Sequence, residues 1–339
     1  MLSQIQKALK LDWPQLYYVT HHMHKRSGRS HLDIFSDMLK CYKDEGYTWL
    51  NYLTFGFDEI IDPEIRSSYL SEYRDNTKII RSCNTKENME ILEDKGQFNR
   101  YFKDFLGRDS LDLRLDSYSQ FREALLKHKV LFIKTPSDCG GDNILRIETQ
   151  GISDPKKLYD KLLKNNQVVV EEAINQDPKM NELSLKSVNT LRVATAISPQ
   201  GKVSVAYMTL RFNTTDAHID NASVGGAFTL LTEEGLIKYP AYINYPREKS
   251  YSVHPANGMN LIGFQVPQIQ QVKDLVCTSA MVLPHSRYIG WDVAITPSGP
   301  VLVEANSIPS VELFQARIHM EDGRGKAQLM QELLGLSLR

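Results

Sequence analysis

The sequence predicts an α+β protein, because segments with the apolar spacing of helices alternate with pairs of strand-like segments joined by short turns. Such pairs favour antiparallel hairpins over the parallel sheet of a Rossmann-like fold. Of the 339 residues, 42% are hydrophobic and 24% are charged, which is close to the globular average and sufficient for a buried core. At about 150 residues per domain, the chain forms two domains or one large domain with several lobes.

The predicted elements follow in order along the chain. Helices are expected at 32–45, where Gly46 is a natural stop, at 86–106 in two pieces, and at 117–128, where Ser117 and Gln120 form a capping box. The central part then predicts strands at 130–134, 143–148 and 167–173, with a helix over 153–164 that begins at Ser153-Asp154-Pro155. The last part predicts strands at 189–198 and 202–212, a hairpin around 233–235, a helix over 267–283, a hairpin of 288–296 with 300–306, and a helix over 326–335.

Composition and charge exclude several classes of protein. Forty basic residues balance forty-one acidic ones, so the chain lacks the basic excess of a general nucleic-acid or polybasic membrane binder. Its longest apolar stretches have the length of strands, and its first residues contain no apolar core of a signal peptide. The four cysteines are far apart and form no Cys-x-x-Cys pair. We therefore expect reduced thiols, a cytoplasmic location, no membrane span and no nucleic-acid partner.

The last predicted hairpin is the most informative segment. Its two apolar faces match only if Trp291 lies opposite Ala305, which requires a three-residue connection at 297–299. This register puts Asp292 directly opposite Glu304, on the same face as Asn306. A two-residue turn would instead put the two carboxylates on opposite faces.

Two opposed carboxylates repel one another unless a cation lies between them. Hard oxygen ligands at this spacing suit Mg²⁺, which binds one or two carboxylates together with substrate phosphates. The alternative is an ordinary sheet with a polar face in solvent. Asn306, in an otherwise apolar strand, favours a metal site formed by Asp292, Glu304 and Asn306.

This pattern resembles the D…ExN metal motif of the ATP-grasp superfamily. Further segments resemble its sugar-transfer-associated branch, also called alpha-L-glutamate ligase-related: VNTLRVAT (188–195), HIDNASVGG (218–226), HPANG (254–258) and RYIGWD (287–292). The resemblance covers residues 74–310, and residues 30–57 resemble the same branch more loosely. It implies two α+β lobes that grip ATP, behind an N-terminal, mainly helical extension. The expected division is a helical extension (1–73), linking helices (74–128), a small lobe with the phosphate loop (129–173) and a large lobe with the metal site (174–339).

The resemblance also implies a set of nucleotide-binding residues. Two lysines would reach the ATP phosphates, a glycine-containing loop would close over them, and the end of a buried strand would contact adenine: Lys95 and Lys134; Ser137, Gly140 and Gly141; Glu171, Glu172, Ala173 and Ile174. Each has a structural alternative. Lys95 could be an ordinary surface lysine, and Lys134 could reach water from the end of its strand. The glycine-containing loop could be an ordinary turn, and the strand ending at Glu171 and Glu172 could emerge into solvent. The ribose partner stays open among Gln176, Asp177 and Asn181.

Arg192 and Arg211 lie within predicted strands, and by resemblance they and Lys134 act on the phosphate being transferred. Their alternative is a structural salt bridge to Asp292 or Glu304. By the same resemblance four residues line the acceptor side: Asn221, Gly225, Gly226 and His254. These could equally be turn formers and a satisfied loop histidine. Residues 21–31 gather histidines and basic side chains, either as a solvated loop or as a site for an acidic acceptor.

Together these features predict an ATP- and Mg²⁺-dependent carboxylate–amine ligase that acts through an acyl-phosphate, with Mn²⁺ as a possible substitute. The branch implies that it joins an amino acid or amine to a sugar- or peptide-type acceptor in the synthesis of cell-surface polysaccharides or conjugates. One alternative is a kinase that phosphorylates a small-molecule or sugar hydroxyl. The other is a nucleotide-binding module without turnover. The substrates, the oligomeric state and the role of residues 1–73 stay open.

Overall fold

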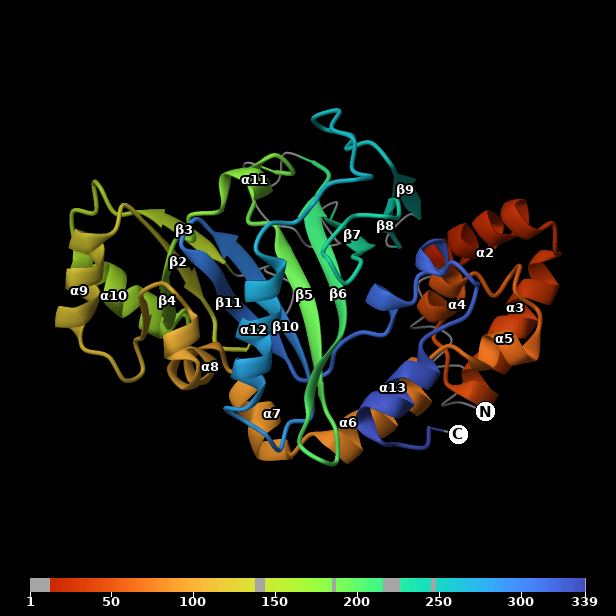
Figure 1. Ribbon diagram of the computed structural model, residues 1–339. Coiled ribbons are helices and arrows are strands. Elements are labelled where there is room, and N and C mark those ends of the chain that lie inside the picture. Colours follow the sequence, from red (N-terminus) through yellow and green to blue (C-terminus); the bar gives the residue numbers. More distant parts are fainter. Residues whose placement is uncertain (1–12, 138–143, 185–186, 216–225, 245–247, 339) are drawn as a thin grey trace, which may run out of the picture.

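The computed structural model of the chain describes residues 13–137, 144–184, 187–215, 226–244 and 248–338. Two sheets lie side by side, and a group of N-terminal helices packs against the larger one (Figure 1). Every strand pair in the described ranges is antiparallel, as the sequence predicts.

The N-terminal part is helical. It consists of α2 (Trp13–Ser27), α3 (His31–Lys40), α4 (Trp49–Phe55), α5 (Pro63–Ser67) and α6 (Thr77–Cys83), with π-helical turns at η1 (Cys41–Glu45) and η2 (Glu72–Asn76). The predicted helix over 32–45 is confirmed as α3 and η1, and it ends at Gly46 with φ of 77°. A Cβ atom at Gly46 would lie 2.8 Å from the backbone nitrogen of Arg74, so glycine is required there both for its φ and for space.

The smaller sheet has the order β1-β4-β2-β3: β1 (Ser110–Asp112), β4 (Val169–Glu172), β2 (Val130–Lys134) and β3 (Leu145–Glu148). Two helices, α9 (Tyr118–Lys127) and α10 (Pro155–Lys164), cover one face and form a separate hydrophobic core with it. Both predicted helix starts are confirmed, with a capping box at Ser117 and Gln120 and an Asp154 cap before Pro155. The predicted helix in two pieces is confirmed as α7 (Lys86–Glu93), α8 (Lys95–Tyr101) and η3 (Lys103–Phe105). Its buried Leu92, Phe98 and Phe102 belong to the hydrophobic core of the larger sheet.

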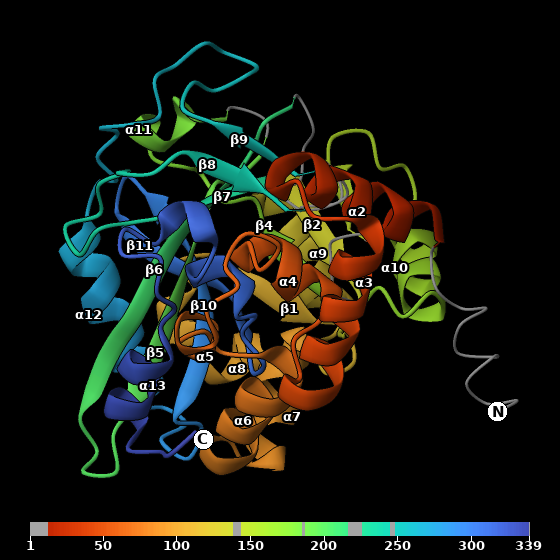
Figure 2. The same cartoon turned by 90° about the vertical axis from the view of Figure 1, so that its right-hand side faces the viewer.

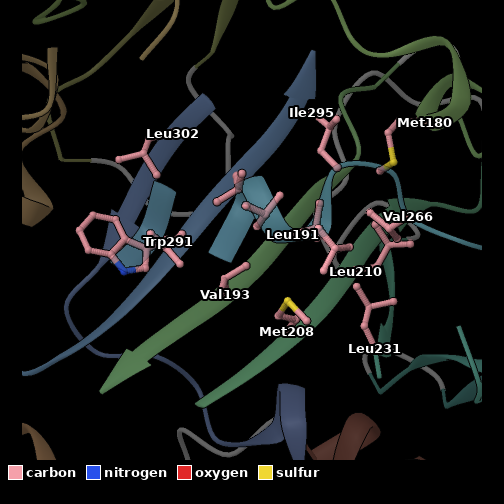
Figure 3. Close-up of a cluster of buried hydrophobic side chains, with 14 of the residues drawn as sticks. Met180, Leu191, Val193, Met208, Leu210, Leu231, Val266, Trp291, Ile295 and Leu302 are labelled. Atoms are coloured by element: carbon pink, nitrogen blue, oxygen red, sulfur yellow. The ribbon is translucent and has the colours of Figure 1, made fainter. Parts of the chain in front are cut away.

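The larger sheet has the order β11-β10-β5-β6-β7-β8-β9. Its strands are β5 (Thr190–Ile197), β6 (Val203–Asn213), β7 (Gly226–Leu230), β8 (Ala241–Ile243), β9 (Lys249–Tyr251), β10 (Tyr288–Thr296) and β11 (Gly299–Asn306). One face packs under α12 (Ile269–Ala280) around Leu191, Val193 and Trp291, which Figure 3 shows among the buried side chains. The remaining helices are α11 (Pro178–Asn181) and α13 (Ala327–Leu334), with 3₁₀ turns η5 (Glu312–Phe314) and η6 (Arg317–His319).

The opposite face of the larger sheet is shared by the N-terminal helices and by the polar residues singled out above. Ala194, Tyr207 and Tyr288 belong to the same hydrophobic cluster as side chains of α2 to α6 and α13. In Figure 2 these helices face the viewer. The ring of Tyr207 stacks on Phe314 at 4.1 Å between centroids. The N-terminal helices therefore support the sheet face that carries Asp292.

The last hairpin corrects one prediction and confirms another. Thr296 pairs with Gly299, so the turn has two residues and not three. Asp292 nevertheless lies opposite Glu304, because a β-bulge at Val303 shifts the register between Asp292 and Val293. The predicted turn was wrong because the alternation was assumed to continue unbroken; the single extra residue restores the predicted pairing of carboxylates.

Candidate functional site

The site begins with Asp292, which is 3% exposed and lies on β10 directly opposite Arg192 of β5. The guanidinium of Arg192 donates through Nε to Oδ1 at 2.5 Å and through Nη2 to Oδ2 at 3.1 Å. Arg211 of β6 adds a third bond, from Nη1 to Oδ2 at 3.0 Å. Both arginines therefore make the salt bridge to Asp292 that the sequence left as an alternative, although this pairing does not prevent them from also meeting a phosphate.

The two facing carboxyl groups have different proton affinities. Burial opposes the ionisation of Asp292, but the charges of Arg192 and Arg211 outweigh it and hold the Asp292 pKa below its ordinary value. Burial and the nearby charge of Asp292 raise the pKa of Glu304. The pair therefore carries one firmly held charge, on Asp292, and one carboxyl that ionises less readily.

Two lysines lie close enough to Glu304 to interact with it electrostatically. The charges of Lys134 and Lys95 lower the Glu304 pKa and so oppose the rise caused by burial and by Asp292. Lys134 ends β2 of the smaller sheet, and Lys95 begins α8. The backbone N–H of Lys95 donates to the carbonyl of Pro136 at 2.8 Å, which joins α8 to the segment that follows β2. The structure thus brings both predicted phosphate lysines to the metal-motif strand.

Glu171 is a buried counter-ion. Its carboxylate accepts from Lys134 Nζ and from Asn99 Nδ2, each at 2.7 Å, and pairs with Arg108 Nη2 at 3.2 Å. Burial would raise its pKa, but Arg108 and Lys134 outweigh this and lower it to about 2. The Glu171 side chain therefore positions the ammonium group of Lys134, so any contact of this residue with adenine would come from its backbone.

The neighbouring hinge residues are arranged differently. Glu172 ends β4 and turns its carboxylate outward, where it accepts from the backbone N–H of Asp109 at 3.1 Å and faces His128. Asp109, His128 and Glu172 are close enough to share a cation, but Lys127 Nζ lies 2.5 Å from Asp109 and already neutralises that carboxylate. Ala173 and Ile174 are partly exposed and follow β4 without regular structure.

All three ribose candidates make hydrogen bonds within the fold. Gln176 is buried and donates to Asn181 Oδ1 at 2.8 Å, while its own oxygen accepts from the N–H of Asn189 at 2.6 Å. Asp177 caps α11 by accepting from the N–H of Lys179 at 2.8 Å through Oδ1. Asp177 and Asn181 are both partly buried, so the ribose partner stays open between these two.

The acceptor-side residues are less connected to this site. His254 is buried, its Nδ1 accepts from the N–H of Ala256 at 3.2 Å, and its Nε2 faces the carbonyl of Asn213 at 3.1 Å, so both ring nitrogens have partners. This favours the satisfied loop histidine. Gly226 is the buried first residue of β7, and Ser137 is exposed. The other predicted residues lie outside the described ranges: Gly140, Gly141, Asn221 and Gly225.

Three members of the basic cluster of residues 21–31 pair with acidic side chains: His22, Arg26 and Arg29. Arg26 donates to Asp58 Oδ1 at 2.5 Å and to both oxygens of Glu248 at 2.9 Å. Glu248 also accepts from the Tyr242 hydroxyl at 2.5 Å. Arg26 thus ties α2 to the segment between β8 and β9 of the larger sheet, which favours a structural role for this arginine.

A comparison with known protein families shows to which family this chain belongs. The family described as sugar-transfer associated ATP-grasp matches residues 74–325, about three quarters of the chain. The chain belongs to this ATP-grasp family. The predicted ATP-grasp fold and its N-terminal helical region are confirmed. Among the described residues, no helix combines the length and the apolar character needed to cross a membrane.

Solved structures of ligases are similar to this ATP-grasp chain in fold. The D-Ala:D-Ser ligase VanG from Enterococcus faecalis is 18% identical with a TM-score of 0.45, over 73% of this chain and 63% of VanG. The ATP-grasp ligase PsnB is 12% identical with a TM-score of 0.43, over 74% and 63%. The D-alanine-D-alanine ligase from Coxiella burnetii is 12% identical with a TM-score of 0.41, over 73% and 58%. The matched region thus spans less than two thirds of each ligase. No curated protein matches the chain in sequence.

The donor set of the ATP-grasp chain fits a hard divalent cation. Asp292, Glu304 and Asn306 offer oxygen atoms from one sheet face, since Asn306 pairs with Gly290 two residues before Asp292. Three arginine contacts use part of the Asp292 carboxylate, which has about four lone-pair positions. Burial and the neighbouring charge of Asp292 raise the Glu304 pKa, so a cation bound between the two carboxyl groups would relieve their repulsion.

Sequence reasoning missed Arg108 and Asn99, the other two partners of Glu171. Arg108 follows Gly107 in the segment before β1, and nothing in its local sequence distinguishes it from a surface arginine. Asn99 lies on the buried face of α8, where a polar residue among aromatic ones was the only available signal.

Proposed function

We propose that this chain is an ATP- and Mg²⁺-dependent ligase that activates a carboxylate as an acyl-phosphate and joins it to an amine. The observation that supports this proposal is the meeting of Asp292 and Glu304 with the lysine at the end of β2, where the two sheets approach. A phosphate chain needs both kinds of group, cations for its charge and oxygen ligands for its metal.

In this proposal Asp292, Glu304 and Asn306 hold Mg²⁺, which when bound neutralises charge on the phosphate oxygens. Lys134 and Lys95 approach the phosphates from the smaller sheet and α8. Glu171 fixes the Lys134 ammonium at 2.7 Å, so that its position does not depend on the nucleotide. The backbone of residues 171–174 reads the edge of adenine, and the phosphate loop containing Ser137, Gly140 and Gly141 covers the phosphates.

The bond-making steps follow from this placement. A substrate carboxylate attacks the γ-phosphorus, which releases ADP and leaves an acyl-phosphate. An amine then attacks the acyl carbon, and inorganic phosphate departs. Arg192 and Arg211 are held charged by Asp292 and face the same side of the sheet, where a guanidinium fork suits the oxygens of the group in transfer.

The family description favours a sugar-linked or peptide-type acceptor, and a role in making cell-surface polysaccharides or conjugates. The same machinery would serve a kinase if the acceptor were a hydroxyl. The expected division at residues 73, 128 and 173 and the cytoplasmic location remain predictions.

The decisive experiment is ³¹P NMR of the purified protein with Mg-ATP and pools of amino acids, amino sugars and uronates. A ligase gives ADP and inorganic phosphate only in the presence of particular pools. A phosphate-ester signal would identify a kinase instead, and the absence of both nucleotide binding and turnover would contradict the proposal. Glu304→Gln should abolish turnover, whereas Glu233→Gln, in an exposed turn of the larger sheet, serves as the matched control.

A further inference from the structure

The β-bulge at Val303 needs a partner from outside the hairpin. A bulge interrupts the ladder of hydrogen bonds, so backbone groups near it must find other donors or acceptors. Arg108 supplies them. Its Nη1 donates to the carbonyl of Leu302 at 2.6 Å, and its Nη2 donates to the carbonyl of Val303 at 3.2 Å. One guanidinium therefore holds the residues directly before Glu304.

The same guanidinium also reaches the smaller sheet. Arg108 Nη2 lies 3.2 Å from Glu171 Oε2, the oxygen that accepts from Lys134 Nζ at 2.7 Å. Arg108 thus stands between two groups that the proposed function requires. Toward the larger sheet it contacts the strand of Glu304, and toward the smaller sheet it contacts the counter-ion of Lys134.

The contacts of Arg108 with Glu171 and β11, called the Arg108 bridge below, are shielded from water. The Arg108 side chain is only 3% exposed and that of Glu171 only 5%, so water competes little for either charge. Gly107 has φ of 55°, and a Cβ atom there would lie 2.4 Å from Val301 Cγ1. The segment before β1 therefore lies directly against β11, which is how the short reach to both carbonyls is achieved. A planar fork of five donors suits two carbonyls and a carboxylate, whereas a lysine offers a point charge.

We propose that Arg108 is a positioning residue that fixes the carboxylate of Glu304 relative to the ammonium group of Lys134. This inference rests on the proposed function, because it assumes that Glu304 binds the metal and Lys134 the nucleotide. Arg108 itself touches neither. It acts through the Leu302 and Val303 carbonyls on one side and through Glu171 on the other.

The test compares Arg108→Lys with wild type by three measurements: Mn²⁺ affinity of the protein–ADP complex by electron paramagnetic resonance, ADP affinity without metal by calorimetry, and melting temperature. Residues that orient metal ligands typically change metal affinity about 10- to 100-fold when replaced. We expect Mn²⁺ binding to weaken by about tenfold or more in Arg108→Lys. Arg122→Lys, on the exposed face of α9, is the matched control and should leave all three values unchanged.

Glu171→Gln separates the two sides of the Arg108 bridge, namely the contact with Glu171 and the contacts with β11. It removes the counter-ion of Lys134 but leaves the contacts of Arg108 with β11, so it should weaken metal-free ADP binding more than Mn²⁺ binding. It also provides a second test if Arg108→Lys does not fold. For that variant, equal losses of both affinities would overturn the inference.

The possible failures are distinguishable. If the wild type binds neither ADP nor Mn²⁺–ADP, the proposed function fails. If the wild type binds both and Arg108→Lys lowers only the melting temperature, Arg108 has a purely structural role and the positioning inference is overturned while the proposed function stands.

Discussion

Asp292→Asn should destabilise the protein, although it changes a proposed metal ligand by a single atom. Asp292 is the counter-ion of two arginines, and both Asp292 and Arg192 are buried, at 3% and 6% exposure. The amide keeps the shape but loses the charge and can no longer accept three arginine hydrogen bonds with its two terminal atoms. Removing one partner of a buried ion pair costs about 3 to 5 kcal/mol. Arg211, at 20% side-chain exposure, can recover some solvation, so we expect the lower end of this range.

Glu304→Gln is the matched comparison, because it neutralises the carboxylate directly opposite. The Glu304 residue is half-buried, but its carboxyl group is largely shielded from water. This shielding and the charge of Asp292 raise its pKa, so its charge opposes folding. We expect this variant to be as stable as wild type or slightly more stable. Both variants should lose Mn²⁺ binding, as electron paramagnetic resonance would show.

Thermal and urea unfolding at pH 7 provide the stability readout, with the urea m-value as a check that the same surface is exposed. Equal stability of Asp292→Asn and wild type would refute the assignment of Asp292 as the anchor of the two arginines. A destabilisation of Glu304→Gln as large as that of Asp292→Asn would refute the argument that the two carboxylates have opposite effects.

Three further predictions concern other parts of the chain. Burial and the charge of Glu72 raise the pKa of Glu312 to about 7, above its ordinary value of 4.5. The free energy of unfolding should therefore fall as the pH rises from the ordinary to the raised pKa. Glu312→Gln should flatten this dependence in thermal melts between about pH 5 and pH 8. Lys134→Met should fold, because Glu171 keeps Arg108 and Asn99 as partners. Its ADP affinity, measured by calorimetry, should fall by about tenfold or more. An unchanged affinity would exclude Lys134 from the nucleotide site. Gly46→Ala should cost about 1 to 2 kcal/mol in urea unfolding because of its positive φ, and more because its Cβ meets the Arg74 backbone; a neutral result would show that η1 rearranges readily.

Local patterns predicted much of this fold. The cap at Ser117, the proline start at Pro155 and the glycine stop at Gly46 each depend on a few adjacent residues, and each is confirmed. The pairing of Asp292 with Glu304 was predicted from alternation alone. The bulge that produces it was not, because a two-residue turn with a bulge and a three-residue turn without one give the same pairing at that point.

The contacts between distant segments could not be predicted in this way. Arg108 meets Leu302 across 194 residues of sequence, and Asn51 bonds Glu312 across 261. Nothing near either residue encodes the partner, since the sequence signal of a buried polar residue is the same as that of an exposed one. The helical spacing of residues 32–45 likewise predicted a helix. It did not predict that the N-terminal helices pack against one face of the larger sheet.

The unequal proton affinities of Asp292 and Glu304 suggest a division of work in the proposed site. Two arginines hold the charge on Asp292, whereas Glu304 keeps its proton more readily because its carboxyl group is shielded from water and lies beside that charge. A cation that binds Glu304 must compete with this proton, so cation binding should release protons and strengthen as the pH rises through the raised Glu304 pKa. Asp292 then serves chiefly to anchor Arg192 and Arg211, and Glu304 with Asn306 supplies the oxygens that are less committed to the protein. On this reasoning Mn²⁺ titrated into the wild-type protein in buffers of different ionisation enthalpy should release protons, and its affinity should rise with pH; an affinity that does not change with pH would contradict the argument.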